Sequence, residues 1–219
     1  MTSLPTPPPA DPLPLVAGWL ADVTASGALR NPNAMALATS GASGAPSVRM
    51  VLLKALAPAG FAVFYTNYRS RKAAELEHKG RAAAVLYWES LGRQVRFEGP
   101  VVRSPATESD EYFASRPLRS QLNAWSSDQS RPLANPADLD AAAERAARKL
   151  GIASDGATAT RPVPRPEFWG GYRLWIDSLE LWAEGANRFH ERLRYRRELD
   201  RVDAFAFRTG AWTVQRLQP

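Results

Sequence analysis

The chain of 219 residues has no cysteine and only two histidines, His78 and His190. The absence of cysteine excludes disulfides, thiolate metal sites and cysteine nucleophiles, and two histidines are too few for a multi-histidine metal site. No apolar run reaches the roughly 18 residues of a membrane-spanning helix, and the first residues lack the basic and apolar order of a signal peptide. We therefore expect a cytoplasmic protein that does not enter the membrane.

Lysine is also scarce, since four lysines stand beside 24 arginines, and the net charge is +6. The guanidinium group binds phosphate and carboxylate in bidentate geometry. A basic chain fits nucleic acid, an anionic membrane surface or phosphorylated small molecules as partners, and composition does not choose among them. Acidic residues interspersed among the C-terminal arginines argue against a continuous basic stripe for nucleic acid.

The proline distribution separates the N-terminus from the rest of the chain. Six of the 18 prolines lie in residues 1–14, which predicts a flexible arm followed by a single domain over residues 15–219. The first part of that domain shows helical spacing and then strand-like alternation. It predicts a helix over 15–25, a strand hairpin over 33–39 and 47–53, a strand over 60–66, a helix over 71–79 with Ser70 as N-cap, and strands over 82–88 and 93–103.

The second part begins with two helix-start signals, Ser104-Pro105 and Asn135-Pro136. They predict helices that end at Ser115 and Leu150, with a loop over 152–165. Strands are then predicted over 172–176, 178–183, 188–197, 204–207 and 212–217. Without regular alternation of strands and helices, the fold class is mainly β with peripheral helices (α+β), built as an antiparallel barrel. No dinucleotide-binding GxGxxG or Walker-type phosphate loop occurs.

The segment 187–192 reads Asn-Arg-Phe-His-Glu-Arg. On a strand, Arg188, His190 and Arg192 project from one face, because side chains alternate with period two. Two guanidinium groups beside an imidazole repel one another unless an anion lies against them. The segment therefore indicates either an anion-binding face or a solvated, arginine-rich strand edge.

Two further groups are suited to anions. Tyr112, Arg116 and Ser120 follow at spacing four, so they share a helix face across the break at Pro117, either as a phosphate cradle or as a surface anchor. Residues 65–72 end a strand and start a helix, where unpaired backbone N–H groups, the helix dipole and nearby cations attract an anion. The alternative for this second group is a capped surface helix.

Two polar side chains and one polar loop are less specific signals. The segment 49–54 is apolar on both faces and predicts a buried strand that delivers Lys54 either to a pocket or to an aggregation-resistant edge. Gln94 lies within an apolar strand, where its amide needs a partner. A polar loop over 125–130 follows the Tyr112 region.

Together these segments resemble the pyridoxamine 5'-phosphate oxidase family, flavoproteins of vitamin B6 metabolism. The resemblance extends from about residue 33 to the C-terminus and rests on seven motifs in the family order. They are RMVLLK (49–54), FYTNYRSRKAAEL (64–76), GRQVRFEG (92–99), YFASRPLRSQLNAWSSDQS (112–130), FWGGYRL (168–174), NRFHERLRYRR (187–197) and RLQP (216–219).

The resemblance implies an FMN-binding split β-barrel that forms a homodimer with FMN at the interface between the subunits. It also implies the following cofactor contacts in this chain: Arg49, Met50, Val51, Leu52, Leu53, Lys54, Tyr65, Thr66, Arg71, Lys72, Gln94, Gln129, Ser130, Trp182 and Arg192. The implied substrate contacts are Lys54, Tyr112, Arg116, Ser120, Arg188 and His190, and Arg188 and His190 are the implied catalytic residues.

The implied reaction oxidises pyridoxamine or pyridoxine 5'-phosphate to pyridoxal 5'-phosphate, with dioxygen as electron acceptor and hydrogen peroxide as product. The partners are then phosphorylated B6 vitamers and dioxygen, with neither nucleic acid nor membrane. Two alternatives stay open, a related flavin oxidase of phenazine biosynthesis and a non-catalytic flavin-binding barrel. The joint presence of the Tyr112, Arg116, Ser120 group and the Arg188, His190 pair favours the B6 oxidase.

Overall fold

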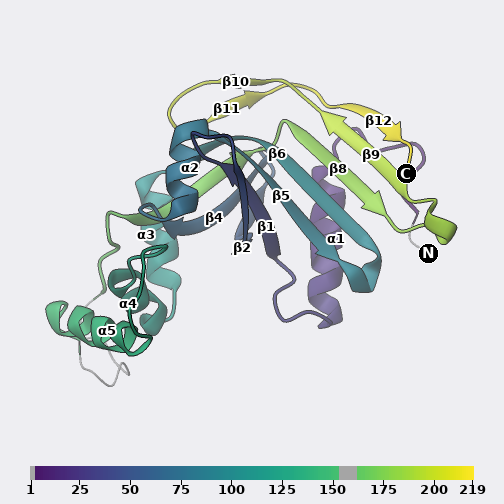
Figure 1. The fold of residues 1–219 in the computed structure, drawn as a ribbon. Helices are drawn as coiled ribbons and strands as arrows, with labels where there is room; N and C mark the ends of the chain where they lie inside the picture. Colours follow the sequence, from purple (N-terminus) through teal and green to yellow (C-terminus); the bar gives the residue numbers. More distant parts are fainter. Residues whose placement is uncertain (1–2, 153–161) are drawn as a thin grey trace.

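The computed structural model describes residues 3–152 and 162–219, which form two antiparallel sheets and the helices around them (Figure 1). The strands of the first half are β1 (Ala34–Ser40), β2 (Pro46–Leu52), β3 (Ala55–Ala57), β4 (Phe61–Asn67), β5 (Arg81–Trp88) and β6 (Arg93–Arg103). Those of the second half are β7 (Trp169–Trp175), β8 (Ser178–Ala183), β9 (Glu191–Arg196), β10 (Leu199–Arg201), β11 (Phe207–Thr209) and β12 (Thr213–Leu217).

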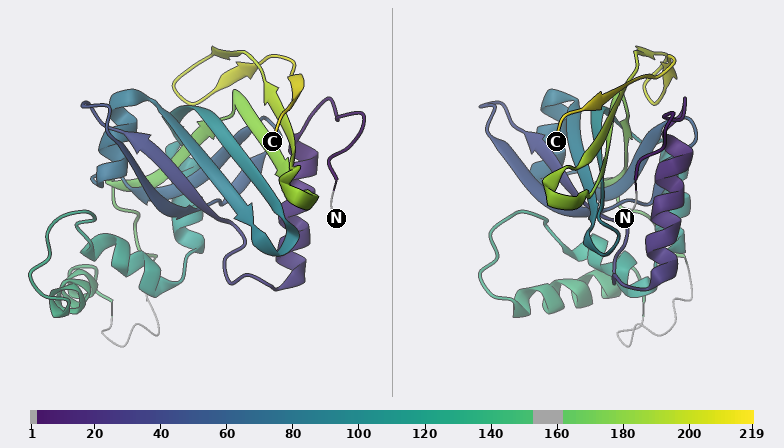
Figure 2. Two further views of the ribbon diagram at one scale, coloured as in Figure 1. Left: turned by 45° about the vertical axis from the view of Figure 1, so that its right-hand side comes forward. Right: turned by 90° about the vertical axis from the view of Figure 1, so that its right-hand side faces the viewer.

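The helices are α1 (Leu13–Ser26), α2 (Arg71–Lys79), α3 (Ala106–Ser115), α4 (Leu118–Ser126) and α5 (Ala137–Lys149), with short 3-10 turns η1 (Glu89–Leu91) and η2 (Ala186–Arg188). α1 places Val16, Trp19 and Val23 in the main core, on one side of the sheet (Figure 2). Helices α3 to α5 lie at one end of the barrel. They share a second small core around Phe113 and Trp169.

Strand β6 connects the two halves of the large sheet. Its residues 93–98 pair with β8 and its residues 101–103 pair with β7, while β5 pairs along its other edge. Gly99 lies between these two pairings, where an added Cβ would stand 1.8 Å from the carbonyl oxygen of Trp175. Because only glycine allows this approach, β6 can change partner and the sheet can curl around its core. The predicted antiparallel barrel with peripheral helices is thus confirmed.

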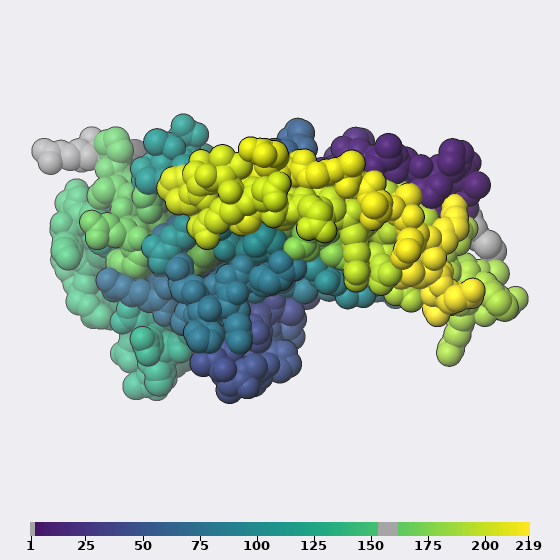
Figure 3. Space-filling model, turned by 90° about the horizontal axis from the view of Figure 1, so that it is seen from above, coloured from purple at the N-terminus to yellow at the C-terminus, as the bar shows by residue number. Residues whose placement is uncertain are grey.

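The N-terminal segment, for which the sequence predicts a flexible arm, makes contacts with the rest of the chain at residues 4–6. The Leu4 side chain is buried and its backbone N–H donates to Glu191. Arg216 donates to the Pro5 carbonyl and to Thr6, so the two ends of the chain lie side by side (Figure 3). α1 also begins two residues before residue 15. Residues 4–6 therefore pack against the C-terminal strands.

Most predicted elements occur within two residues of their expected bounds, but the strand predicted over 172–176 begins three residues earlier, at Trp169, and the strand predicted over 188–197 begins three residues later. β9 begins at Glu191, because Asn187 and Arg188 adopt left-handed conformations with φ of 52° and 67° in η2. Arg188 and His190 therefore do not alternate along a strand. The predicted strand over 204–207 is displaced to β11 and pairs with β10, an element the pattern did not indicate.

Four local predictions need correction. Ser104 does not cap α3, which begins at Ala106 after Pro105, and Ser70 makes no capping hydrogen bond to α2. The start of the predicted loop over 125–130 belongs to α4, a helix that begins after Pro117. In this single chain β2 is not buried on both faces, since Val48 is 68% exposed. The loop predicted over 152–165 lies largely outside the described residues.

Candidate functional site

A cavity of about 430 Å³ opens between β2, β4 and the start of α4. It brings together eleven of the residues predicted for the site, namely Met50, Val51, Leu52, Lys54, Tyr65, Thr66, Lys72, Tyr112, Arg116, Ser120 and Gln129. Asn67, Pro117 and Trp169 complete the lining and were not predicted. The volume lies within the range of small-molecule sites.

Arg116 is a half-buried cation of this cavity and has no ion-pair partner among the described residues. It occupies the turn between α3 and α4, and its guanidinium lies 4.5 Å from the centre of the Trp169 ring. Its buried Nη1 has no hydrogen-bond partner among the described residues. Burial lowers the pKa of Arg116, and the nearby Tyr112 opposes that shift. A buried donor of this kind favours an anionic ligand, because leaving it unpaired is costly.

Stacked aromatic rings form the wall beside Arg116. The rings of Tyr65 and Tyr112 lie 3.9 Å apart at 16°, and Trp169 lies nearly parallel to both. Lys54 places its Nζ 5.5 Å from the centre of the Tyr112 ring. The predicted cradle of Tyr112, Arg116 and Ser120 therefore assembles although Pro117 divides it between two helices.

Lys72 supplies a second buried cation. Its Nζ donates to Thr66 Oγ1 at 2.9 Å and to Ser70 Oγ at 3.1 Å, and Thr66 in turn donates to Gln129. Burial, and secondarily the charge of Arg49, lowers the pKa of Lys72 to about 8. The lysine therefore gives up its proton more easily than an exposed lysine while no anion lies beside it.

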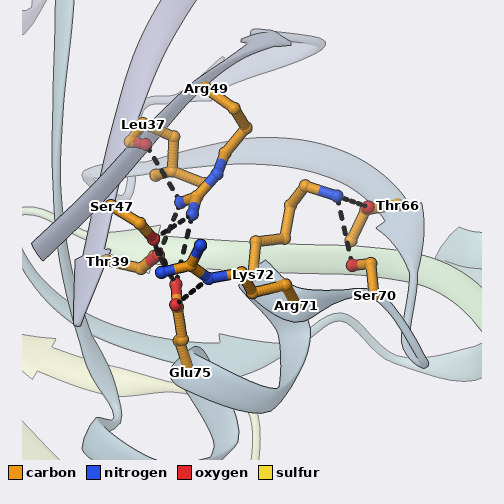
Figure 4. A network of polar contacts seen from close by, with 9 residues as sticks. All are labelled: Leu37, Thr39, Ser47, Arg49, Thr66, Ser70, Arg71, Lys72 and Glu75. Atoms are coloured by element: carbon orange, nitrogen blue, oxygen red, sulfur yellow. Dashed lines mark hydrogen bonds and ion pairs between the residues drawn. The ribbon is translucent and has the colours of Figure 1, made fainter. Parts of the chain in front are cut away.

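Arg49 and Arg71 do not line the cavity; both bond to the Glu75 carboxylate on α2 (Figure 4). Glu75 also accepts hydrogen bonds from Thr39 and Ser47. Burial alone would raise the Glu75 pKa, but these hydrogen bonds outweigh it and lower the pKa to about 2. Glu75 was not predicted as a site residue, although its i,i+4 spacing from Arg71 was a visible signal.

Gln94, Trp182 and Arg192 form a separate group. They are direct partners across β6, β8 and β9, so they share one sheet face, and they lie outside the cavity of the same chain. Arg192 makes a bidentate ion pair with Glu180 and donates to the carbonyl of Gln218. The Trp182 ring lies 4.7 Å from the His190 ring.

The loop from Gly185 to His190 presents the predicted catalytic pair. The Gly185 N–H donates to Nδ1 of His190 at 3.3 Å, so a neutral His190 carries its proton on Nε2. Left-handed φ values at Asn187 and Arg188 turn the chain, and an L-residue adopts them only where the surroundings impose them.

Two predicted cofactor contacts lie elsewhere. Leu53 is buried in the main core, where its N–H donates to the Asn33 carbonyl. Ser130 is exposed, with a φ of 73°, next to the cavity residue Gln129.

None of the helices in residues 3–152 and 162–219 is long and apolar enough to span a bilayer.

Comparison with known proteins agrees with this arrangement. Residues 24–149 match the pyridoxamine 5'-phosphate oxidase family, and residues 169–219 match the pyridoxine 5'-phosphate oxidase C-terminal dimerisation region. The pyridoxine/pyridoxamine 5'-phosphate oxidase of Cereibacter sphaeroides is 46% identical over 209 residues, which cover 95% of each chain.

Two solved structures share the fold. PhzG from Burkholderia lata, in complex with tetrahydrophenazine-1-carboxylic acid, has a TM-score of 0.80 at 32% identity, covering 97% of this chain and 94% of its own. A pyridoxamine 5'-phosphate oxidase-related, FMN-binding protein from Nostoc punctiforme has a TM-score of 0.68 at 14% identity, covering 95% and 98%. By its two family regions and its relatives, the chain belongs to the pyridoxamine 5'-phosphate oxidase family.

Proposed function

We propose that this protein is an FMN-dependent oxidase that converts pyridoxamine 5'-phosphate and pyridoxine 5'-phosphate to pyridoxal 5'-phosphate, with dioxygen as electron acceptor. The relatives that carry this activity in their names support the reaction. A phosphorylated substrate is supported above all by the buried Nη1 of Arg116, which has no hydrogen-bond partner among the described residues and lies beside Tyr112 and Ser120. A cation and two hydroxyl groups in one cavity suit a phosphate monoester.

The donors around Lys72 fit the phosphate of FMN. Lys72 and Thr66 lie in the cavity, and Arg71 begins α2 beside them, so cations and the positive end of the helix dipole attract one anion together. The chemistry that FMN supplies when bound is two-electron oxidation of the substrate carbon, with hydrogen peroxide formed from dioxygen. The protein's part is to bind and orient the reactants.

A second copy of the chain completes the proposed site. Met50 on β2 is 63% exposed. It pairs with Ala36, which also faces Val85, so Met50 shares a sheet face with Tyr87 and Gln94. This partly apolar face is suited to a partner subunit. Dimerisation there brings the group of Gln94, Trp182 and Arg192, and the Arg188 and His190 loop, to the partner's cavity.

Within that dimer, the residues of the two chains have different roles. Tyr112, Arg116 and Ser120 hold the substrate phosphate. Arg188 and His190 come from the other chain and hold the pyridine ring against the flavin, and neither needs to be a strong base. This division accounts for the separation of the two groups in one chain.

The test measures cofactor and turnover together. Purified protein is expected to be yellow, to release FMN on denaturation, and to consume dioxygen with either B6 phosphate while forming stoichiometric pyridoxal 5'-phosphate. A yellow protein that turns over neither B6 phosphate would contradict the substrate, and a protein that binds no flavin would contradict the whole proposal.

A flavin oxidase of phenazine biosynthesis is the second candidate, because the PhzG structure is 32% identical over nearly the whole chain. The carboxylate of a tricyclic substrate can also pair with Arg116, but it has only two oxygens, whereas Arg116, Tyr112 and Ser120 together suit the three oxygens of a phosphate monoester, which disfavours this candidate. The same oxygen-uptake assay with a dihydrophenazine carboxylic acid decides between the two.

A further inference from the structure

The carboxylate of Glu75 joins two arginines from different elements. Its Oε1 accepts from Nε of Arg71 at 2.8 Å, one helical turn away on α2. Its Oε2 accepts from Nη2 of Arg49 on β2 at 3.1 Å and from Ser47 at 2.6 Å. Figure 4 shows dashed contacts from the carboxylate to both guanidinium groups, with the Lys72 side chain directed to Thr66 and Ser70. Glu75 itself is buried, so these contacts are shielded from water.

The two arginines are held to different degrees. Both terminal nitrogens of Arg49 bond to the protein, since Nη1 donates to the Leu37 carbonyl and Nη2 to Glu75. Arg71 uses only Nε, and its terminal nitrogens have no hydrogen-bond partner in the part of the chain that the structure describes. The Arg71 side chain is 65% exposed. Glu75 is thus the contact that fixes where the free end of Arg71 lies.

We propose that Glu75 is a positioning residue for the FMN phosphate, acting through Arg71 and Arg49. It holds Arg71 at the first turn of α2, beside Lys72, with both terminal amino groups available to an anion. This inference rests on the proposed function. Fixing the arginines before binding lowers the conformational entropy that binding costs.

If only the charge of Glu75 mattered, the FMN affinity of a Glu75 variant would change in the opposite direction. Glu75 carries a negative charge near the place assigned to a phosphate dianion, so neutralising it should strengthen FMN binding if its charge is what matters. Positioning predicts weaker binding, because Arg71 then moves freely in solvent. The direction of the change in FMN affinity therefore decides between the two roles.

The experiment compares Glu75→Gln, Glu75→Asp and the matched control Glu77→Gln in the full-length apoprotein. Glu77 lies on the same helix and bonds to Arg103 and Tyr172 instead. Flavin fluorescence quenching gives the dissociation constants for FMN and for riboflavin, which lacks the phosphate, and thermal unfolding of each apoprotein checks its fold.

Both Glu75 variants are expected to bind FMN about tenfold more weakly, the effect of losing the orientation of one or two flexible side chains. Riboflavin binding and the Glu77→Gln variant should stay unchanged. In an Arg71→Ala background, Glu75→Gln should have a much smaller effect, because the side chain it positions is gone.

Tighter or unchanged FMN binding by Glu75→Gln would overturn the inference, as would equal losses for FMN and riboflavin. Glu75→Asp keeps the negative charge but shortens the side chain. Weaker FMN binding by this variant therefore supports positioning even if Glu75→Gln fails to fold, and unchanged binding contradicts it. A wild-type apoprotein that binds neither flavin would instead contradict the proposed function, which keeps the two failures distinct.

Discussion

At the scale of single residues, we expect the replacement of Arg116 to have the clearest effect on substrate turnover. Replacing it by alanine removes the buried, unpartnered cation of the cavity, and kcat/KM for both B6 phosphates should fall about 100-fold, as expected for a lost charge-assisted contact. FMN affinity should be unchanged. The neighbouring exposed Arg119, changed to alanine, is the control. Equal loss of flavin would assign Arg116 to the cofactor phosphate instead.

The lowered pKa of Lys72 predicts that cofactor binding depends on pH. Its pKa is lowered to about 8, by burial and then by Arg49, so the ammonium destabilises the folded apoprotein below that pH. The penalty is relieved as Lys72 loses its proton in the folded state, and its contribution to apoprotein stability therefore increases from about pH 8 towards the ordinary lysine pKa near 10.4.

A bound phosphate favours the charged lysine, so FMN affinity should be highest below pH 8. Above it, the affinity should fall by up to about tenfold per pH unit until the pKa of the bound form is reached. Fluorescence titrations of the apoprotein between about pH 7 and 9.5 measure this slope. Riboflavin should show no such slope, and an equal slope for it would point to a group other than the phosphate site.

At the scale of elements, the loop from Gly185 to His190 is fixed by close packing. A Cβ on Gly185 would stand 1.9 Å from the Phe189 carbonyl oxygen, so Gly185→Ala must displace the loop and the His190 contact. We expect kcat/KM to fall at least about tenfold and the free energy of unfolding to fall by about 1–3 kcal/mol.

The control for that change is Gly210→Ala, in the loop before β12, where the nearest atom to an added Cβ is 3.4 Å away. Steady-state kinetics and thermal unfolding compare the two variants. If Gly185→Ala retained full activity, the loop geometry would not matter for the reaction.

The same loop shows where sequence patterns stop being informative. Alternation located β1, β5 and β6 well, because their buried faces impose a period of two. The alternation of Arg188, His190 and Arg192 did not mark a continuous strand, since Asn187 and Arg188 are left-handed and β9 begins only at Glu191. Close contacts within the loop, from Gly185 to Phe189 and His190, accompany that conformation, and an alternating pattern of side chains does not encode them.

Other site features could not be predicted for related reasons. The apolar residues of β2 suggested a buried strand, yet its outer face is exposed in one chain, where we propose that a partner subunit covers it. Lys54, Tyr112, Arg116 and Ser120 were identified from spacing and motif, and the structure brings them into one cavity. Trp169, which lies against Arg116, was not assigned to the site because a tryptophan in a strand is usually only core.

At the scale of the whole molecule, many of the arginines form ion pairs with carboxylates of the same chain. Arginines tie together segments far apart in the chain, as in the pairs Arg93–Asp22, Arg165–Asp110 and Arg173–Glu108. The half-buried Arg116 and the buried Lys72 of the cavity have no carboxylate partner among the described residues. The basic composition therefore points to small anions in one cavity, and a nucleic-acid partner is not needed to explain it.

The proposed dimer makes its own prediction, because each site takes Arg116 from one chain and Arg188 from the other. Arg116→Ala and Arg188→Ala homodimers should both be nearly inactive. In a heterodimer of the two variants, one site carries both changes and the other carries neither. Random assembly makes half of the dimers mixed, so co-expression of the two variants should restore about a quarter of wild-type activity.

Differently tagged chains allow the mixed dimer to be purified, and it should then show about half of the wild-type turnover with an unchanged KM. Two Arg116→Ala chains carrying different tags are the control and should stay inactive. If each site were contained in one chain, the mixed dimer would have one defect in every site and no activity would return. Restored activity thus requires the loop that bears Arg188 to act on the partner's cavity.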